Sequence, residues 1–161
     1  MKRVRRVLSR IRHIRGHGVH SPYIYTLVRE VFMRRKLLCT TDSIALYDLL
    51  QRVGELGERR CVELQNVATH CGYSHFTIDS EELQGTDMVV VTSLHPVALL
   101  EGIVATAAAC GTTVAILHPE GSTERERVCE RITTEHKSTT VRRREYVLIF
   151  NNHLPKQHFE L

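Results

Sequence analysis

The second half of the chain alternates apolar strand patterns with helical patterns, and this alternation limits the fold more than any other feature. Residues 87–93 (DMVVVTS) and 112–119 (TTVAILHP) are continuous runs of mostly β-branched and apolar residues. Such runs are typical of strands that are buried on both faces of a parallel sheet. Helical patterns occupy residues 95–111 and 122–137. The order strand, helix, strand, helix predicts right-handed crossovers and a mainly parallel sheet.

The chain ends on two further strand patterns. Residues 138–152 predict one long strand, and residues 156–161 (KQHFEL) predict a short last one. The connection NNHLP at 151–155 is short enough for an antiparallel hairpin. We therefore expect an α/β fold with a mainly parallel sheet of about five strands that ends in a C-terminal antiparallel hairpin.

The first half of the chain is dominated by helical patterns. Three stretches have apolar residues at helical spacing: 1–16, 22–36 and 42–56. Residues 59–65 (RRCVELQ) form a short apolar run and predict a strand. In the segment that follows, the pattern indicates only a short strand at 76–78 and a turn of helix near 80–83.

Positive charge is concentrated at the start of a chain whose net charge is +4. Residues 1–36 carry eleven Lys and Arg residues against one acid, whereas the other 125 residues carry eleven against seventeen acids. The two parts therefore have net charges of +10 and −6. A basic arm on an acidic body points to an anionic partner: a nucleic acid, an anionic membrane surface or the body itself. The alternative is that the apolar stripe of the arm packs on the domain and its arginines face water. The candidate anion-binding residues are Arg3, Arg5, Arg6, Arg10, Arg12 and Arg15.

Metal sites and membrane segments are not indicated. The five cysteines are scattered singly and form no C-x-x-C pair, so zinc-ribbon spacing is missing. His13, His17 and His20 lie close together, but Gly16 and Gly18 interrupt any helix there, which favours a structural turn over a metal site. The basic start is followed by no long apolar run, so we expect neither a signal peptide nor a membrane span. These features predict a reduced, cytoplasmic protein without a bound metal.

Two phrases at opposite ends of the chain resemble one protein family. Residues 17–22 read HGVHSP, with Tyr23 in place of the usual Phe, and the tail 156–161 is similar to the family's final strand phrase. On these residues the chain resembles class I S-adenosylmethionine-dependent methyltransferases, and more narrowly a Bacteroidetes-type branch. The resemblance implies a reduced Rossmann-like (class I methyltransferase-like) sheet preceded by N-terminal helices. We assign residues 1–40 to a basic helical arm and residues 41–161 to this domain.

The chain departs from the family pattern where the cofactor would bind. In the family, the first strand ends in an E-x-G-x-x-x-G loop whose backbone approaches S-adenosylmethionine. The resemblance makes Glu63 the acid of that loop, Gly72 a remnant of its end and Asp79 the acid for the ribose hydroxyls. Gln65, however, stands where the first glycine should be. Residues 65–87 number only 23, too few for two strand–helix units, so at least one strand is missing.

Two histidines follow the buried parallel strands. His95 and His118 lie at the carboxyl edge of the expected sheet, where such sheets place their ligands. Neighbouring strands would bring the two imidazoles within side-chain distance, as weak candidates for catalysis. The alternative, which we favour, is that His95 and Thr92 cap the next helix and His118 is an ordinary loop residue.

Two functions remain open. The favoured one is a shortened, non-catalytic relative of the methyltransferases that holds no cofactor and binds a partner through the basic arm or the sheet edge. The alternative is an active S-adenosylmethionine-dependent methyltransferase in which Glu63, Gly72 and Asp79 carry the cofactor. In that case His95 would assist the transfer. Lost strands would leave an uncovered sheet edge, which makes a homodimer an expectation.

Overall fold

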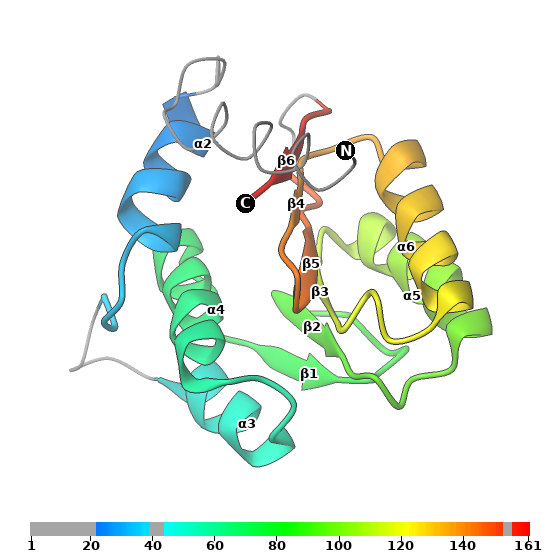
Figure 1. Ribbon diagram of the computed structural model, residues 1–161, viewed down its shortest axis with the longest axis horizontal. Coiled ribbons are helices and arrows are strands. Elements are labelled where there is room, and N and C mark those ends of the chain that lie inside the picture. Colours follow the sequence, from blue (N-terminus) through cyan, green and yellow to red (C-terminus); the bar gives the residue numbers. More distant parts are fainter. Residues whose placement is uncertain (1–21, 39–43, 153–155) are drawn as a thin grey trace, which may run out of the picture.

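A six-stranded sheet between two layers of helices forms the protein (Figure 1). The computed structural model describes residues 22–38, 44–152 and 156–161. The first layer contains α2 (Pro22–Leu27), the π-helix η1 (Val28–Phe32), α3 (Ala45–Val53) and α4 (Glu58–Cys71). The second contains the 3-10 helix η2 (Val97–Leu99), α5 (Leu100–Cys110) and α6 (Thr123–Glu135). The helix predicted over residues 1–16, with all six candidate arginines, lies outside the described residues.

The sheet is mixed, with one strand opposed to the others. Its strands are β1 (Phe76–Ile78), β2 (Met88–Val91), β3 (Thr113–Leu117), β4 (Thr140–Arg142), β5 (Tyr146–Ile149) and β6 (His158–Glu160). Their spatial order is β1-β2-β3-β5-β4-β6. Only β5 pairs antiparallel with its neighbours β3 and β4, while the other pairs are parallel. The expected α/β fold with a mainly parallel sheet is therefore confirmed, with six strands among the described residues.

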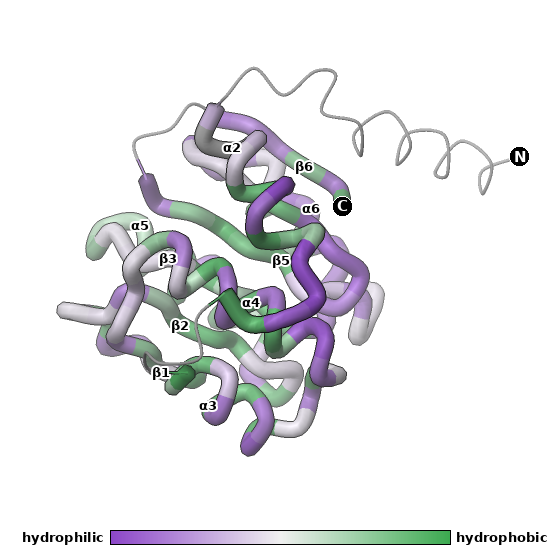
Figure 2. Tube along the Cα trace, turned by 90° about the vertical axis from the view of Figure 1, so that its left-hand side faces the viewer, coloured by the Kyte–Doolittle hydropathy of each residue, from purple (hydrophilic) through white to green (hydrophobic). Residues whose placement is uncertain are grey.

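Two apolar cores lie on opposite faces of the sheet. On β2, Met88 and Val90 pack with residues of the first helical layer, whereas Val89 and Val91 pack with residues of α5 and α6. Alternate residues of β3 and β5 divide between the two cores in the same way. Because side chains of a strand alternate between faces, a strand covered on both sides is apolar throughout. Figure 2 shows β2, β3 and β5 as mostly hydrophobic stretches inside the fold.

The predicted C-terminal hairpin is wrong in its position. Residues 138–152 do not form one long strand, because the chain turns after β4 and returns as β5, with Arg143 N–H donating to the Tyr146 carbonyl at 2.8 Å. The last strand, β6, pairs in parallel with β4 and not with β5. All four residues of β5 are buried, which suits a strand in the interior of the sheet. The basic triplet at 142–144 begins at the end of β4 and continues into the turn, and acidic side chains of other elements pair with its first two members, Arg142 and Arg143.

The strand predicted at residues 59–65 is also wrong, since these residues belong to helix α4. The helix ends at Gly72, whose φ of 71° closes it in the left-handed region that favours glycine. Its periodicity is hidden because α4 buries polar residues beside apolar ones. Gln65 and Asn66 are 3% and 0% exposed, and their side chains bond the backbone of neighbouring segments. A helix buried on most sides loses the apolar stripe that sequence patterns depend on.

The other expected elements agree more closely. The strand at 76–78 is confirmed as β1, and the helix predicted over 42–56 is α3. The helix expected over 22–36 ends earlier, at Phe32, after one turn of π-helix. The turn of helix expected near 80–83 is wrong, because these residues form bends and loop. None of the described helices combines the length and hydropathy that a bilayer-spanning segment needs.

Candidate functional site

The carboxyl ends of β1, β2 and β3 meet at one edge of the sheet, because these strands are parallel neighbours. Asp79 directly follows β1, and its carboxylate accepts two hydrogen bonds from Thr92, which directly follows β2. The backbone N–H of Thr92 lies 2.8 Å from Asp79 Oδ1, and its hydroxyl lies 2.6 Å from Oδ2. Asp79 holds this geometry with a φ of 49°, in the left-handed region that Asp tolerates better than most residues. The acid expected for a ribose is thus bonded to the neighbouring strand end.

His95 lies beside the same carboxylate. Its side chain is 5% exposed, and Nδ1 lies 3.6 Å from Asp79 Oδ1. Its other ring nitrogen, Nε2, is buried and has no hydrogen-bond partner among the described residues. Its backbone N–H donates to the Thr92 carbonyl at 3.3 Å, which closes a turn before η2. The structure therefore places His95 next to Asp79, a pairing that sequence patterns did not indicate.

The loop between α3 and α4 covers the next part of the edge. Glu55 accepts hydrogen bonds from the backbone N–H of Ser93 at 2.9 Å and from its hydroxyl at 2.9 Å. His118, which follows β3, donates from Nε2 to the Glu55 carbonyl at 2.9 Å. His95 and His118 therefore have different partners, one a carboxylate after β1 and the other a loop carbonyl. The structure does not join them as a histidine pair.

A buried arginine of α6 also contacts the carboxyl edge. Arg125 of α6 is 2% exposed, and its guanidinium donates to the carbonyls of Thr92 at 2.8 Å, Leu117 at 3.0 Å and His95 at 3.2 Å. These carbonyls lie just after or at the ends of β2 and β3, where no further strand pairing satisfies them. The sequence held a signal for this role, because Arg125 interrupts the apolar face that also carries Cys129 and Ile132.

Glu63 lies elsewhere, inside the packing between α4 and the β4–β5 hairpin. It is 0% exposed. Its carboxylate accepts from Arg60 at 2.8 Å, from Arg143 at 3.1 Å and from the Tyr146 hydroxyl at 2.8 Å. Burial and the negative charge of Glu63 raise the pKa of Tyr146 well above its usual value. The Glu63 carboxylate is thus surrounded by donors of its own chain.

The two arginines around Glu63 are themselves held in place. Arg60 also bonds Glu145 at 2.9 Å. Burial alone would lower the pKa of Arg60, but the carboxylates of Glu63 and Glu145 raise it above the usual value. The Arg143 guanidinium lies over the Phe32 ring, 5.2 Å from its centroid. This network joins α4, η1 and the hairpin.

The predicted cofactor residues are therefore not brought together. Glu63 is enclosed between α4 and the hairpin, Gly72 ends α4, and Asp79 bonds Thr92. No hydrogen bond joins any two of these three described residues. Both carboxylates are already bonded within the chain, so this set does not fit the family's loop around S-adenosylmethionine.

One cavity lies at the carboxyl edge of the sheet, and another lies between helices α5 and α6. The edge cavity has a volume of about 610 Å³ and is lined by Ser93, His118, Glu120, Gly121, Arg144 and Glu145. Its lining is mostly charged and polar. A nucleoside needs apolar walls for its base, and this lining offers few.

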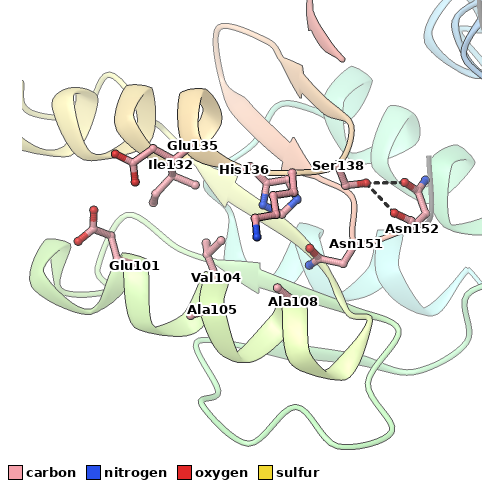
Figure 3. A pocket seen from close by; sticks show the side chains of 11 residues that line it. Glu101, Val104, Ala105, Ala108, Ile132, Glu135, His136, Ser138, Asn151 and Asn152 are labelled. Carbon is pink, nitrogen blue, oxygen red and sulfur yellow. Dashed lines mark hydrogen bonds between the residues drawn. The ribbon is translucent and has the colours of Figure 1, made fainter. Parts of the chain in front are cut away.

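The cavity between α5 and α6 also has a volume of about 610 Å³ (Figure 3). Val104, Ala108 and Ile132 form its aliphatic part. At one end, the polar groups of Ser138 and Asn152 bond each other at 2.7 Å. His136 donates from Nε2 to a backbone carbonyl at 2.9 Å. The polar groups of this cavity are thus largely used within the chain, and it does not adjoin the carboxyl edge.

Comparisons with known proteins add no neighbour. No family model matches the chain, and neither a curated protein nor a solved structure matches it. Within the described part of the chain, no group of three or more His, Cys, Asp or Glu side chains could hold a metal ion.

Proposed function

We propose that this chain is a non-catalytic, cytoplasmic binding module built on a reduced Rossmann-like domain of methyltransferase descent. One observation carries the proposal: the polar backbone groups at the carboxyl edge of β2 and β3 are bonded to side chains of the chain itself. Asp79 and Glu55 bind the N–H groups of Thr92 and Ser93, and Arg125 binds carbonyls beside them. This edge is where open α/β sheets bind their ligands.

The chemistry of methyl transfer supports the same proposal. An enzyme that transfers a methyl group contributes mainly the positioning of donor and acceptor. Positioning needs a cofactor pocket, and the residues predicted for it are used in other contacts. Glu63 in particular has three donors around its buried carboxylate. A chain without the pocket would retain the fold and its surfaces, but little catalytic power.

The proposed binding surfaces are the basic arm and the sheet edge. The six arginines of the arm (Arg3, Arg5, Arg6, Arg10, Arg12 and Arg15) would contact an anionic partner, either a nucleic acid or a membrane surface. Strand β1 is an edge strand of the sheet, so its outer side pairs with no other described strand. A second copy of the chain is the proposed occupant of that edge, which would give a homodimer.

The alternative function is an active S-adenosylmethionine-dependent methyltransferase. Calorimetric titration of the full chain with S-adenosylmethionine and S-adenosylhomocysteine separates the two. The proposal expects no saturable heat and no thermal stabilisation at about millimolar ligand, whereas a bound ligand at a hundred times its Kd would add about 2.7 kcal/mol. Saturable binding at micromolar concentrations would overturn it. In that case the variants Asp79→Gly and, as an exposed control, Glu81→Gln would show whether the ligand uses the carboxyl edge.

A further inference from the structure

A short basic surface projects from the helical layer opposite α5 and α6. Met33, Arg34, Arg35 and Lys36 follow η1 directly, and all four are exposed. Met33 is 65% exposed, among the most exposed of the large apolar residues described. We call Met33, Arg34, Arg35 and Lys36 the basic loop.

The cations of the basic loop lack counter-ions in the described part of the chain. No carboxylate there lies within 4.0 Å of Arg34, Arg35 or Lys36, whereas the preceding Arg29 has Glu30 at 3.7 Å. Among the described residues, the loop therefore presents three positive charges without a carboxylate partner. A charge of this kind attracts an anionic surface and is weakened by salt.

The loop is also anchored at both ends. On one side, Val31 and Phe32 are 0% and 3% exposed and fix the end of η1 in the core. On the other side, the buried amide of Asn66 accepts from the Leu38 N–H at 2.8 Å and donates to the Lys36 carbonyl at 3.0 Å. Asn66 thus bonds both an N–H and a carbonyl of this segment, as a neighbouring strand would, and anchors the end of the loop. A surface that is already ordered loses less entropy when it binds.

We propose that the basic loop docks the protein on an anionic phospholipid bilayer, with Met33 at the level of the acyl boundary and the three cations at the headgroups. This inference deepens the proposed function by naming the partner of the interaction module. Each Lys or Arg held near an anionic membrane raises the affinity for that membrane by about fivefold. Sites for single-stranded nucleic acid use aromatic side chains for base stacking, and the basic loop offers a methionine instead. The combination of an apolar side chain and cations therefore favours the bilayer.

Vesicle co-sedimentation of the full chain tests the proposal. The probes are vesicles of phosphatidylcholine alone and of phosphatidylcholine with roughly 30% phosphatidylglycerol, at low and at physiological salt. The variant Arg34→Gln/Arg35→Gln/Lys36→Gln should weaken binding to the anionic vesicles by roughly tenfold or more. Met33→Gln should weaken it without changing the net charge. Thermal unfolding of each variant verifies that it is folded.

A matched control removes the same charge elsewhere. Arg52, Arg59 and Arg127 are exposed and have no carboxylate within 4.0 Å among the described residues. Their triple change to Gln should leave anionic-vesicle binding within about twofold of the unchanged protein, apart from the long-range charge effect. Equal losses in the two triple variants would overturn the proposal, because net charge alone would then explain binding.

Two further results would also overturn it. One is failure of the full chain to bind anionic vesicles, and the other is binding that the basic-loop variants leave unchanged, which would assign the contact to other residues. Tight binding to duplex or single-stranded nucleic acid without vesicle binding would transfer the surface to that partner. None of these outcomes depends on the titration with S-adenosylmethionine, so failure of this inference and failure of the proposed function are distinguishable.

Discussion

Replacing Glu63 with Gln should destabilise the fold strongly, because Glu63 balances two guanidinium groups in a buried network. Its carboxylate lies 2.8 Å from Arg60 Nη1, 3.1 Å from Arg143 Nη2 and 2.8 Å from the Tyr146 hydroxyl. Replacement leaves Arg143 without its carboxylate partner, whereas Arg60 keeps Glu145 at 2.9 Å. Removing one partner of a buried ion pair costs about 3–5 kcal/mol. For a chain of this length, each kcal/mol lowers the melting temperature by about 2–4 °C. The expected loss is therefore on the order of 6–20 °C.

Urea titration and differential scanning calorimetry of Glu63→Gln measure this loss. The control is Glu81→Gln, which removes the same charge from an exposed loop residue and should change stability by less than about 0.5 kcal/mol. A Glu63→Gln protein that melts within about 2 °C of the unchanged chain would refute the reasoning. If Glu63 instead served a cofactor, its replacement would alter ligand binding with little effect on stability.

The remaining predictions concern the C-terminal end of α4, the titration of His158 in β6 and the anchor of the basic loop. Gly72→Ala should cost about 1 kcal/mol because alanine opposes the φ of 71° at the end of α4, while Gly102→Ala inside α5 should be neutral or stabilising; equal effects in urea unfolding would contradict the geometry. Burial lowers the pKa of His158, so the neutral ring is favoured in the fold and stability falls as the pH drops below about 6.5. His158→Gln should reduce the difference between unfolding free energies at about pH 7.5 and pH 5, and an unchanged difference would count against it. Asn66→Ala leaves two backbone groups of the basic loop region without partners, at about 1–3 kcal/mol each, and should speed amide exchange across residues 33–38; unchanged exchange there would exclude the anchoring role.

The part of the fold from β2 to α6 was largely predictable from the sequence. Residues 88–91 and 113–117 are continuous apolar runs because both faces of β2 and β3 are covered by helices. The helices α5 and α6 end and begin with local signals: Gly111 closes α5 in the left-handed region, and the Ser122 hydroxyl accepts the Arg125 N–H at 3.1 Å. Local chemistry fixes these boundaries, so a local pattern finds them.

The first half and the C-terminal strands were less predictable because their decisive contacts are distant in the sequence. Residues 59–65 have the pattern of a strand, and only the partners of Gln65 and Asn66 explain why a helix buries these polar residues. Those partners lie 18 and 28 residues away in the sequence. The break between β4 and β5 is equally hidden, since Arg143 at this turn pairs with Glu63, 80 residues earlier in the chain. Periodicity cannot report contacts of this range.

The candidate site shows the same division. The sequence placed Asp79, His95 and His118 at strand ends, and the structure places all three at the carboxyl edge. It did not indicate that Asp79 binds Thr92, or that Glu55 reaches Ser93 from a loop 38 residues away. Which partner a polar side chain finds at such an edge depends on the register of neighbouring strands, and register is a property of the folded sheet.

Amide hydrogen exchange at the strand ends tests most directly whether the chain's own side chains occupy the carboxyl edge. The Thr92 N–H donates to Asp79 at 2.8 Å, so NMR should find it protected in the unchanged protein. In Asp79→Gly, which removes the carboxylate and suits the φ of 49°, protection of Thr92 should fall by roughly tenfold, while the core amides of β3 keep theirs. Equal exchange of the Thr92 amide in both proteins would mean that Asp79 does not close the edge, and would contradict the account.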